Sequence, residues 1–261
     1  MFVAVRGAGD LATGIALRLH HAGFEMAMTE IAAPLSVRRA VCFSRAVYDG
    51  RAQVEDISAV LVKNEAGMKE AFKEKLVAVF VDPDAAIVKS LKPLALVDAV
   101  MAKRNTGTAL SDAPLVIGVG PGFTAGTDCH AVIETRRGHT LGRVIKEGCA
   151  LPNTGVPGDV GGYTVERLIR APADGVFKAV ASIGDTVKKG DIVAFVDDTP
   201  IPAEIDGILR GLLPSGLTVK RGMKAGDVDP RSERQHCFTV SDKALSVAGG
   251  VLEALLGFSV K

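Results

Sequence analysis

The stretch FVAVRGAGDLATG, Phe2–Gly14, decides how the N-terminal part of this chain is expected to fold. Its first residues are apolar and predict a buried strand, and the residues that follow Asp10 predict a helix. Between the two, Gly7, Gly9 and Ala12 stand at the spacing G-x-G-x-x-[G/A]. These small residues allow a tight turn, the approach of backbone to a pyrophosphate, and close packing of a helix on a strand. The stretch therefore predicts a phosphate-binding loop between a strand and a helix.

An acidic residue follows at the distance that nucleotide recognition requires. The segment Phe24–Thr29 predicts a second strand, and Glu30 comes directly after it, 21 positions beyond Gly9. In Rossmann-like units an acidic side chain at about this position accepts hydrogen bonds from the ribose of an adenosine. We therefore expect a dinucleotide-type ligand at this loop. The predicted ligand-binding residues here are Gly7, Ala8, Gly9, Asp10, Leu11 and Glu30.

Two alternatives stay open at this loop. One is a plain α/β turn in which Glu30 is a surface residue. The other concerns Asp10, an anion at the expected phosphate position, which is able to cap the helix through its side-chain oxygen. Arg38 and Arg39 follow closely and are able to contact a phosphate, although a solvated helix face explains them somewhat better.

The composition excludes several classes of protein. The chain has 261 residues, of which 48% are hydrophobic and 23% charged, and its formal net charge is +1. This balance gives no basic excess for nucleic acid, and no apolar run is long enough for a membrane span. The chain starts with an apolar strand that no basic region precedes, so no signal peptide is expected. The 4 cysteines lack C-x-x-C spacing and predict reduced thiols in a cytoplasmic protein.

Three regions follow one another along the chain. Residues 1–165 predict a Rossmann-like nucleotide-binding domain, an α/β fold with a parallel sheet, that ends in a glycine-rich β extension. Residues 166–231 predict a β-rich domain, and residues 232–261 a C-terminal helix that packs back on the first domain. Within the β extension, the loop GVGPGF follows an apolar strand, and its Gly118 and Gly120 are predicted to line the ligand.

The β extension also holds candidate acid–base residues. His130 and Glu134 share strand parity and are expected to face the same way, with Asp128 and His139 nearby. This set is incomplete and matches no known ligand spacing, so no metal is predicted. The turn-rich segment Pro152–Gly162 predicts either a hinge between domains or an active-site loop.

Residues 166–231 carry an internal repeat. A shift of 32 residues aligns APADGVFKAVASIGDTVKKGDIVAFVD with AEIDGILRGLLPSGLTVKRGMKAGDVD. Two short copies predict two supersecondary units that bury a common face. The pattern resembles the barrel-sandwich hybrid of biotinyl and lipoyl domains, which carry their cofactor on a lysine between the two halves. The corresponding segment here, VDDTPIPAE, has no lysine, so neither biotin nor lipoate is expected.

Long motifs spread over most of the chain resemble the YqeB family. They include VRGAGDLATG, LVDAVMAKRNTGT, VIGVGPGF, VIETRRGHTLGR, PNTGVPG and DVDPR. Members of that family are described as accessory proteins of selenium-dependent molybdenum hydroxylases or of molybdenum cofactor biosynthesis. The resemblance implies a cytoplasmic maturation factor that binds NAD(P) or a molybdopterin-type dinucleotide. Its implied partners are a molybdenum hydroxylase apoprotein or other cofactor-maturation proteins, and the resemblance supplies no catalytic residue.

Two other functions are compatible with the sequence. One is an NAD(P)-dependent oxidoreductase for a small molecule, with His130, His139 or Lys103 as proton donor, although no Tyr-x-x-x-Lys pair is present. The other is a non-enzymatic scaffold that docks a hydroxylase through the repeat. The sequence leaves open whether the protein is an enzyme and whether it forms a homo-oligomer.

Overall fold

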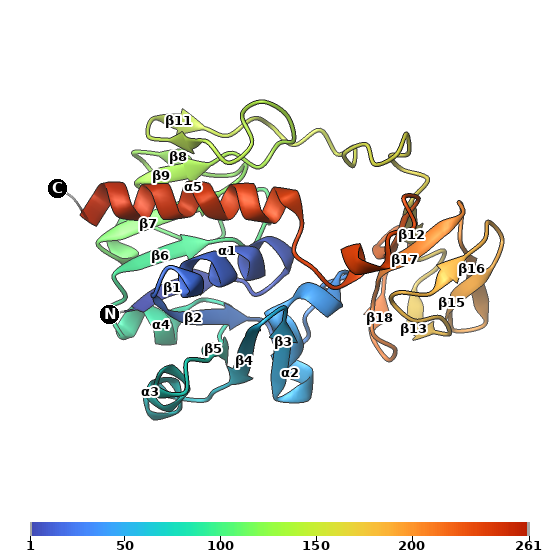
Figure 1. Ribbon diagram of the computed structural model, residues 1–261, viewed down its shortest axis with the longest axis horizontal. Coiled ribbons are helices and arrows are strands. Elements are labelled where there is room, and N and C mark those ends of the chain that lie inside the picture. The colour runs from blue at the N-terminus through green and yellow to red at the C-terminus, as the bar shows by residue number, and fades with distance from the viewer. Residues whose placement is uncertain (1, 260–261) are drawn as a thin grey trace. The chain divides into compact units, whose positions relative to one another are not determined.

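A computed structural model describes residues 2–259 and divides them into two units (Figure 1). Unit 1 contains residues 2–34, 42–154 and 240–259, and unit 2 contains residues 35–41 and 155–239. The predicted boundaries after residues 165 and 231 therefore differ from the division in the structure, which falls after residues 154 and 239. Unit 2 also takes a short segment from the N-terminal part of the chain.

Unit 1 is built around one mixed sheet, in which the strands follow the order β10-β9-β7-β6-β1-β2-β5-β4-β3. The neighbouring strands from β9 to β4 are parallel, and β10 and β3 pair antiparallel at the two edges. Strand β1 is buried along its whole length, which explains why its first four residues are all apolar. The strands are β1 (Phe2–Arg6), β2 (Glu25–Glu30), β3 (Arg51–Val54), β4 (Ile57–Leu61), β5 (Val77–Val81), β6 (Ala95–Asp98), β7 (Leu115–Val119), β9 (Ala131–Ile133) and β10 (Val144–Ile145). A separate two-stranded sheet joins β8 (Thr124–Ala125) to β11 (Gly148–Cys149).

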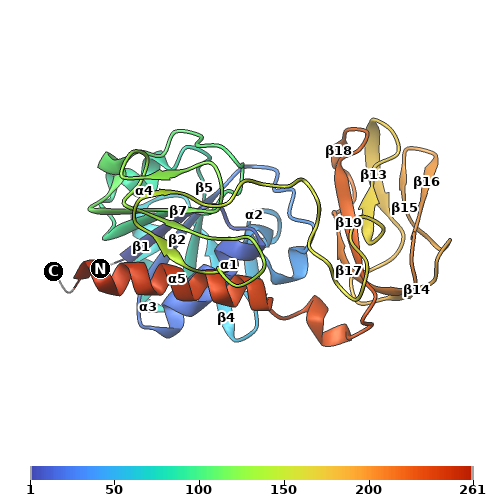
Figure 2. The ribbon, with the colours of Figure 1, turned by 90° about the horizontal axis from the view of Figure 1, so that it is seen from above.

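Helices cover both faces of this sheet (Figures 1 and 2). Residues of α3 and α4 share an apolar core with alternate residues of the central strands, and α1 and α5 lie side by side over the opposite face. Asn64 caps α3, because its side chain accepts a hydrogen bond from the backbone of Gly67. The helices are α1 (Asp10–His21), α2 (Ala46–Asp49), α3 (Glu65–Lys73), α4 (Ala86–Ser90) and α5 (Asp242–Ser259), with 3-10 turns at Arg39–Val41, Phe43–Arg45, Leu110–Asp112 and Arg234–Cys237.

Glycines set how closely α5 approaches its neighbours. A Cβ at Gly14 of α1 would lie 2.7 Å from the Cβ of Ala244, and a Cβ at Gly250 would lie 2.0 Å from the carbonyl oxygen of Gly142. Both distances are shorter than carbon and oxygen atoms tolerate, so the two positions require glycine. The helix predicted within residues 232–261 is α5, and its last helical residue is Ser259.

Unit 2 consists of two four-stranded antiparallel sheets that enclose an apolar core. The first has the strand order β12-β19-β17-β14, and the second has the order β16-β15-β13-β18. Their strands are β12 (Leu168–Arg170), β13 (Gly175–Ala179), β14 (Thr186–Val187), β15 (Ile192–Val196), β16 (Thr199–Pro202), β17 (Gly207–Leu212), β18 (Thr218–Val219) and β19 (Lys224–Asp229).

The internal repeat is visible in the structure of unit 2. Strands β13, β14 and β15 recur 32 residues later as β17, β18 and β19. The two copies exchange partners, because β13 pairs with β18 and β14 pairs with β17. Two matching ion pairs follow the same exchange, since Lys188 contacts Asp206 at 2.9 Å and Lys220 contacts Asp174 at 2.8 Å.

The fold class predicted from the sequence, a Rossmann-like parallel sheet domain joined to a biotinyl- or lipoyl-like barrel-sandwich domain, is wrong. The main sheet is mixed, and the predicted β extension is part of it rather than an addition, because β7, β9 and β10 continue the sheet beyond β6. The repeat lies in two separate antiparallel sheets, and residues 35–41 complete their unit. A strand–glycine–helix motif fixes only local geometry, so it does not determine edge strands or which distant segments join a sheet.

Candidate functional site

The candidate site lies in unit 1, where the order of the parallel strands reverses. From β1 the chain passes to β2 on one side of the sheet, and it later returns to β6 on the other side. In open α/β sheets the loops beyond the carboxyl ends of strands part at such a point and leave a crevice for ligands. The predicted glycine loop, residues 7–9, follows β1 at this position, so it stands where the sheet favours binding.

A buried ion pair holds together the ends of the two central strands. Arg6, the last residue of β1, donates to the carboxylate of Asp98 at the end of β6 over 3.1 Å. The same guanidinium donates to the hydroxyl of Thr106 at 2.8 Å and to the carbonyl of Pro83 at 3.1 Å, and Thr108 donates to Asp98 at 2.6 Å. Arg6 and Asp98 are 5% and 1% exposed, so they are paired as buried charges must be.

Three loops converge at these strand ends with little space between their backbones. A Cβ at Gly7 would lie 3.2 Å from the backbone of Ala99, in the loop after β6, and a Cβ at Gly122 would lie 2.5 Å from the backbone nitrogen of Arg104. In the same loop Met101 and Lys103 have φ angles of 63° and 62°, in the left-handed region that costs energy for side-chain-bearing residues. The loop after β6 is therefore held in a strained conformation beside the glycine loop.

Glu30 is turned toward the glycine loop itself. Its carboxylate accepts hydrogen bonds from the backbone nitrogen of Ala8 at 3.1 Å and from that of Ile31 at 2.8 Å. Burial raises the pKa of Glu30 above its usual value, although these two hydrogen bonds act in the opposite direction. The carboxylate thus braces the loop, and a ribose would have to share an acceptor that the protein's own backbone already uses.

The start of α1 brings opposite charges together. Gly9 is the N-cap of α1 with an extended backbone, and it makes no side-chain capping hydrogen bond; Asp10 is the first helical residue. Asp10 and Glu134, at the end of β9, act to raise the pKa of Lys243 in the first turn of α5, whereas burial, the largest effect, and Arg137 lower it, with a net lowering. Sequence reasoning did not select Lys243, because nothing local connects it with a loop more than two hundred positions earlier.

The remaining predicted ligand residues have structural surroundings of their own. Leu11 is in the first turn of α1. A Cβ at Gly118 would lie 2.5 Å from the ring of Phe123, so that ring, rather than a ligand, occupies the space beside Gly118. Gly120 has a φ of +79°, and a Cβ there would lie 2.7 Å from the hydroxyl of Thr135. Both glycines allow the loop after β7 to fold back on its own neighbours.

The predicted acid–base residues are not brought together. His130 lies just before β9, where its Nδ1 accepts a hydrogen bond from the backbone of Val116 at 3.0 Å. Glu134 follows β9 at the opposite end and accepts backbone hydrogen bonds from Thr135 and Leu151 at 2.7 and 2.8 Å. His139 is exposed, and Asp128 accepts from the backbone of Thr124 at 2.7 Å. Within residues 2–259, no group of three or more His, Cys, Asp or Glu side chains is placed to hold a metal ion.

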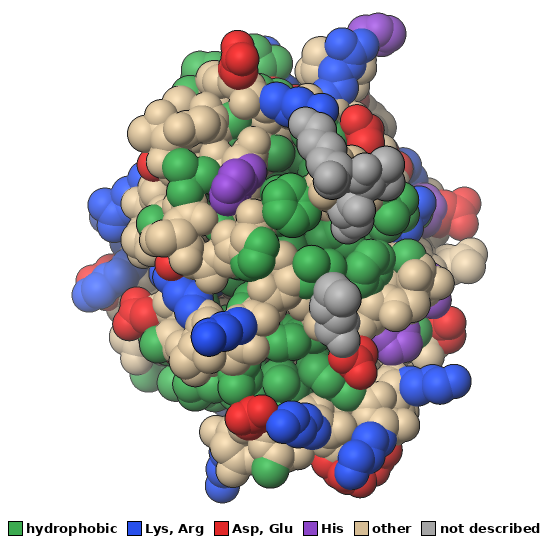
Figure 3. Space-filling model, turned by 90° about the vertical axis from the view of Figure 1, so that its left-hand side faces the viewer, with side chains coloured by type: hydrophobic (Ala, Val, Ile, Leu, Met, Phe, Trp, Pro, Cys, Tyr) green, Lys and Arg blue, Asp and Glu red, His purple; other side chains and the backbone are tan. Residues whose placement is uncertain are grey.

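His130 instead borders an apolar pocket at the amino ends of the strands. The pocket has a volume of about 250 Å³, and Figure 3 shows apolar side chains gathered on this face of the molecule. Its lining residues are Leu115, His130, Ala131, Val144, Lys146, Glu253, Ala254, Gly257 and Phe258. His130, one of the three proton donors considered for an oxidoreductase, therefore lies at the far end of the sheet from the glycine loop.

Arg38 and Arg39 belong to unit 2, not to the glycine loop. Arg38 donates to the carbonyl oxygens of His236 and Thr239 at 3.1 and 3.0 Å, and Arg39 donates to that of Leu212 at 2.9 Å.

Among the described residues, no helix has the length and apolar character that crossing a bilayer demands.

Comparison with known proteins gives one close relative. No protein-family model matches the chain. The chain is 50% identical over 254 residues to the "Uncharacterized protein YqeB" of Escherichia coli (strain K12), a match that covers 97% of this chain and 47% of that protein. The similarity supports membership of the YqeB family. The chain spans about half the length of this relative.

Three of the solved structures that match the chain are distant from it. An aspartoacylase family protein from Mesorhizobium loti is 17% identical with a TM-score of 0.23, covering 24% of this chain and 22% of that one. The succinylglutamate desuccinylase/aspartoacylase of Rhodobacter sphaeroides is 25% identical with a TM-score of 0.22, covering 24% and 21%. The apo ectoine utilization protein EutE of Ruegeria pomeroyi is 11% identical with a TM-score of 0.24, covering 87% and 85%. TM-scores of this size assign the chain neither a fold nor a function.

Proposed function

We propose that unit 1 binds a dinucleotide-type ligand, NAD(P) or a molybdopterin-type dinucleotide, at residues 7–11. The observation that carries the proposal is the N-terminus of α1, where the N-cap Gly9 has no side chain to bond the first amide groups and where the strand order reverses. The first amide groups of such a helix carry a partial positive charge and favour a phosphate. Two further cationic side chains, Lys103 and Arg104, are exposed on the neighbouring loop after β6.

The residues fit the phosphate part of such a ligand better than its ribose. Gly7 and Gly9 let backbone come close, whereas the carboxylate of Glu30 already accepts from Ala8 and Ile31. Asp10 adds a negative charge at the helix start, and Lys243 lies close enough to interact with it electrostatically. We therefore propose that Lys243 offsets the charge of Asp10 when a pyrophosphate binds.

In the cell, we propose that the protein serves as an accessory or maturation factor for selenium-dependent molybdenum hydroxylases. The similarity to YqeB supports this role only through the family description, because the related protein is named as uncharacterized. A deletion strain is expected to contain the hydroxylase polypeptide but to lack its activity. A deletion strain with normal hydroxylase activity would contradict the proposed role.

Ligand binding is tested separately from the cellular role. Mass spectrometry of small molecules released from freshly purified protein is expected to find NAD(P) or a pterin dinucleotide, and calorimetry with NAD⁺ and NADP⁺ provides an affinity. Gly9→Val should abolish this binding, because its side chain stands where the pyrophosphate must approach. Gly249→Ala is the matched control, since its Cβ meets nothing within 4 Å. The proposed site is refuted if folded Gly9→Val protein binds the dinucleotide with the same affinity as wild type. It is also refuted if mass spectrometry finds no dinucleotide and calorimetry detects no binding.

A further inference from the structure

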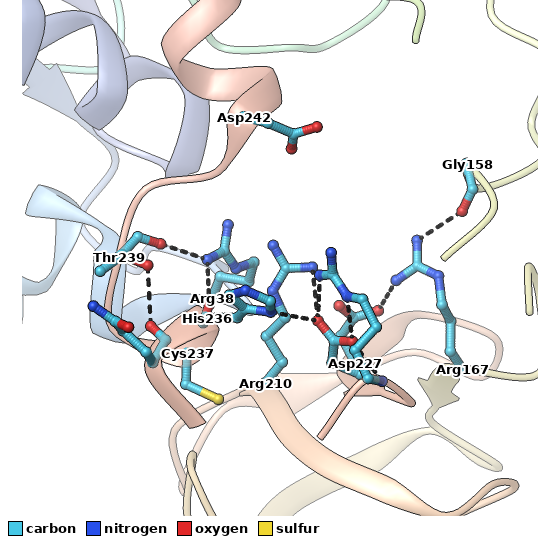
Figure 4. A network of polar contacts seen from close by, with 12 residues as sticks. Arg38, Gly158, Arg167, Arg210, Asp227, His236, Cys237, Thr239 and Asp242 are labelled. Atoms are coloured by element: carbon cyan, nitrogen blue, oxygen red, sulfur yellow. Dashed lines mark hydrogen bonds and ion pairs between the residues drawn. The ribbon is translucent and has the colours of Figure 1, made fainter. Parts of the chain in front are cut away.

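Unit 2 contains a cluster of arginines gathered around two buried carboxylates. We call it the arginine cluster and define it by its charged members, Arg38, Arg167, Arg210, Arg231, Asp227 and Asp229. Arg38, Arg167 and Arg210 are only 8%, 9% and 8% exposed, although arginine is almost never so buried in proteins without a partner. Figure 4 shows Arg38, Arg210 and Arg167 along one line over the strands of unit 2.

The strand geometry explains how the carboxylates come to face the arginines. Asp227 and Asp229 are two residues apart in β19 and point to the same side of the sheet, opposite to Val228, which packs in the apolar core. The pairing of β17 with β19 shifts register between Leu209 and Gly211, so Arg210 is the extra residue of a bulge. Bulges of this kind redirect a side chain, and they are over-represented beside active sites.

Positive charge exceeds negative charge around these carboxylates. Asp229 is contacted by Arg231 at 2.6 Å, by Arg210 at 3.6 Å and by the ring of His236 at 3.9 Å. Burial acts to raise the pKa of Asp229, but the hydrogen bonds and charges of Arg231, together with Arg210, outweigh it and lower that pKa below the usual value. The three buried guanidinium groups and the two buried carboxylates carry a formal charge of +1, and Arg231 adds a partly exposed positive charge.

One buried donor in the cluster lacks an acceptor. Arg167 forms an ion pair with Asp227 through Nη1 and donates to the carbonyl of Gly158 through Nη2 at 3.3 Å, yet its buried Nε has no hydrogen-bond partner among the described residues. A buried donor without a partner is rare in native proteins and calls for a missing ligand or water. The side chains of Arg231 and His236 are 44% and 39% exposed, so the cluster remains open to solvent on one side.

We propose that the arginine cluster is an anion site that binds the phosphoryl groups of a small molecule. The planar guanidinium group of arginine matches the oxygens of a phosphate with two parallel hydrogen bonds, which a compact lysine ammonium does not offer. The site is distinct from the glycine loop, because every residue that defines it belongs to unit 2. It does not depend on the function proposed for unit 1.

The test measures the binding of inorganic pyrophosphate to the full chain by calorimetry at low ionic strength. We expect saturable binding that weakens as salt is added, and a loss of about tenfold or more in affinity in Arg231→Gln, because one charge-assisted hydrogen bond is removed. Arg221→Gln is the matched control, since it removes one exposed positive charge of unit 2 outside the cluster. The glycine loop of unit 1 is itself proposed to bind a phosphate group, so the two arginine variants are also compared in the Gly9→Val protein, in which that loop is blocked.

A measurement on the unmodified protein covers the case in which Arg231→Gln does not fold. Phenylglyoxal modifies exposed arginines, and peptide mass spectrometry locates the product. Pyrophosphate should slow the modification of Arg231 and leave that of Arg221 unchanged. Absence of saturable binding, equal losses in both glutamine variants, or equal protection of both arginines overturns the proposal. Citrate that binds as tightly as pyrophosphate overturns the phosphoryl assignment in favour of carboxylates.

Discussion

Substitution by alanine at Gly250 and at Gly249, which are adjacent in α5, should change the stability of unit 1 in opposite directions. At Gly250 an alanine Cβ would lie 2.0 Å from the carbonyl oxygen of Gly142, whereas an ordinary contact begins near 3.4 Å. The helix and the loop would have to separate by roughly 1.4 Å. Gly142 cannot yield easily, because its own φ is +81° and a Cβ there would meet the carbonyl oxygen of Ser246 at 2.5 Å.

The magnitude follows from two opposing effects. Overpacking against backbone costs about 3 kcal/mol, at the upper end of the usual range. Alanine regains about 1 kcal/mol of helix propensity over glycine, so Gly250→Ala should destabilise unit 1 by about 2 kcal/mol. At Gly249 a Cβ meets nothing within 4 Å, so only the gain of about 1 kcal/mol remains.

Thermal unfolding followed by circular dichroism, with hydrogen exchange of peptides from α5, measures both variants. The melting temperature should fall by about 4–8 °C for Gly250→Ala and rise by about 2–4 °C for Gly249→Ala. Exchange in α5 should accelerate in the first variant and slow in the second. Shifts of the same sign in the two proteins would falsify the close approach of α5 to the loop at Gly142.

Two further predictions concern the titration of buried carboxylates. Glu30→Gln should destabilise unit 1 by about 1–3 kcal/mol near pH 4, because an amide cannot accept from both Ala8 and Ile31. The pKa of Glu30 is raised in the folded protein, so its stabilising contribution is complete below the usual glutamate pKa of about 4.3 and is lost as the pH rises through the folded value. Urea unfolding at several pH values from 4 to 7 should therefore find that the difference between wild type and Glu30→Gln shrinks as the pH rises; a growing difference would contradict the assignment. The pKa of Asp229 is lowered, so its contribution is complete above the usual aspartate pKa of about 3.9 and is lost as the pH falls through the folded value. Acid unfolding of unit 2, followed by hydrogen exchange in β19, should begin at a higher pH in Arg231→Gln than in wild type, and an unchanged midpoint would show that Arg231 does not hold this pKa down.

The sequence predicts local elements well because their signals are local. The apolar run that begins at Phe2 forms a buried strand, and the 32-residue repeat recurs in the structure. The hydrogen bonds of Glu30 to the backbone of Ala8 and Ile31 were not predictable, because spacing places a carboxylate near the loop but does not set the direction of its side chain. The ion pair of Arg6 was not predicted for a similar reason, since its partner Asp98 lies 92 positions away and only the sheet brings the two residues together.

The division into units was also beyond local patterns. Residues 35–41 read as a continuation of the segment after Glu30, yet they complete unit 2, where the backbone nitrogen of Leu212 donates to the carbonyl of Val37 at 2.9 Å. Arg38 is part of this segment, so it lies in the arginine cluster rather than at the glycine loop. The assignment of this segment to unit 2 depends on contacts between segments far apart in the chain, and local sequence patterns do not reveal such contacts.

The contact between α1 and α5 has a consequence for the order in which the protein is made. Gly14 and Ala244 pack together, but all of residues 155–239 are synthesised between them. During translation the first helix emerges long before the helix that covers it. Unit 2 can complete its sheets while unit 1 still lacks α5, so one face of the sheet of unit 1 stays without this helix until residues 242–259 leave the ribosome. The nascent chain is therefore expected to hold its glycine loop in an unfinished unit, and to become competent to bind a ligand only after α5 has been made.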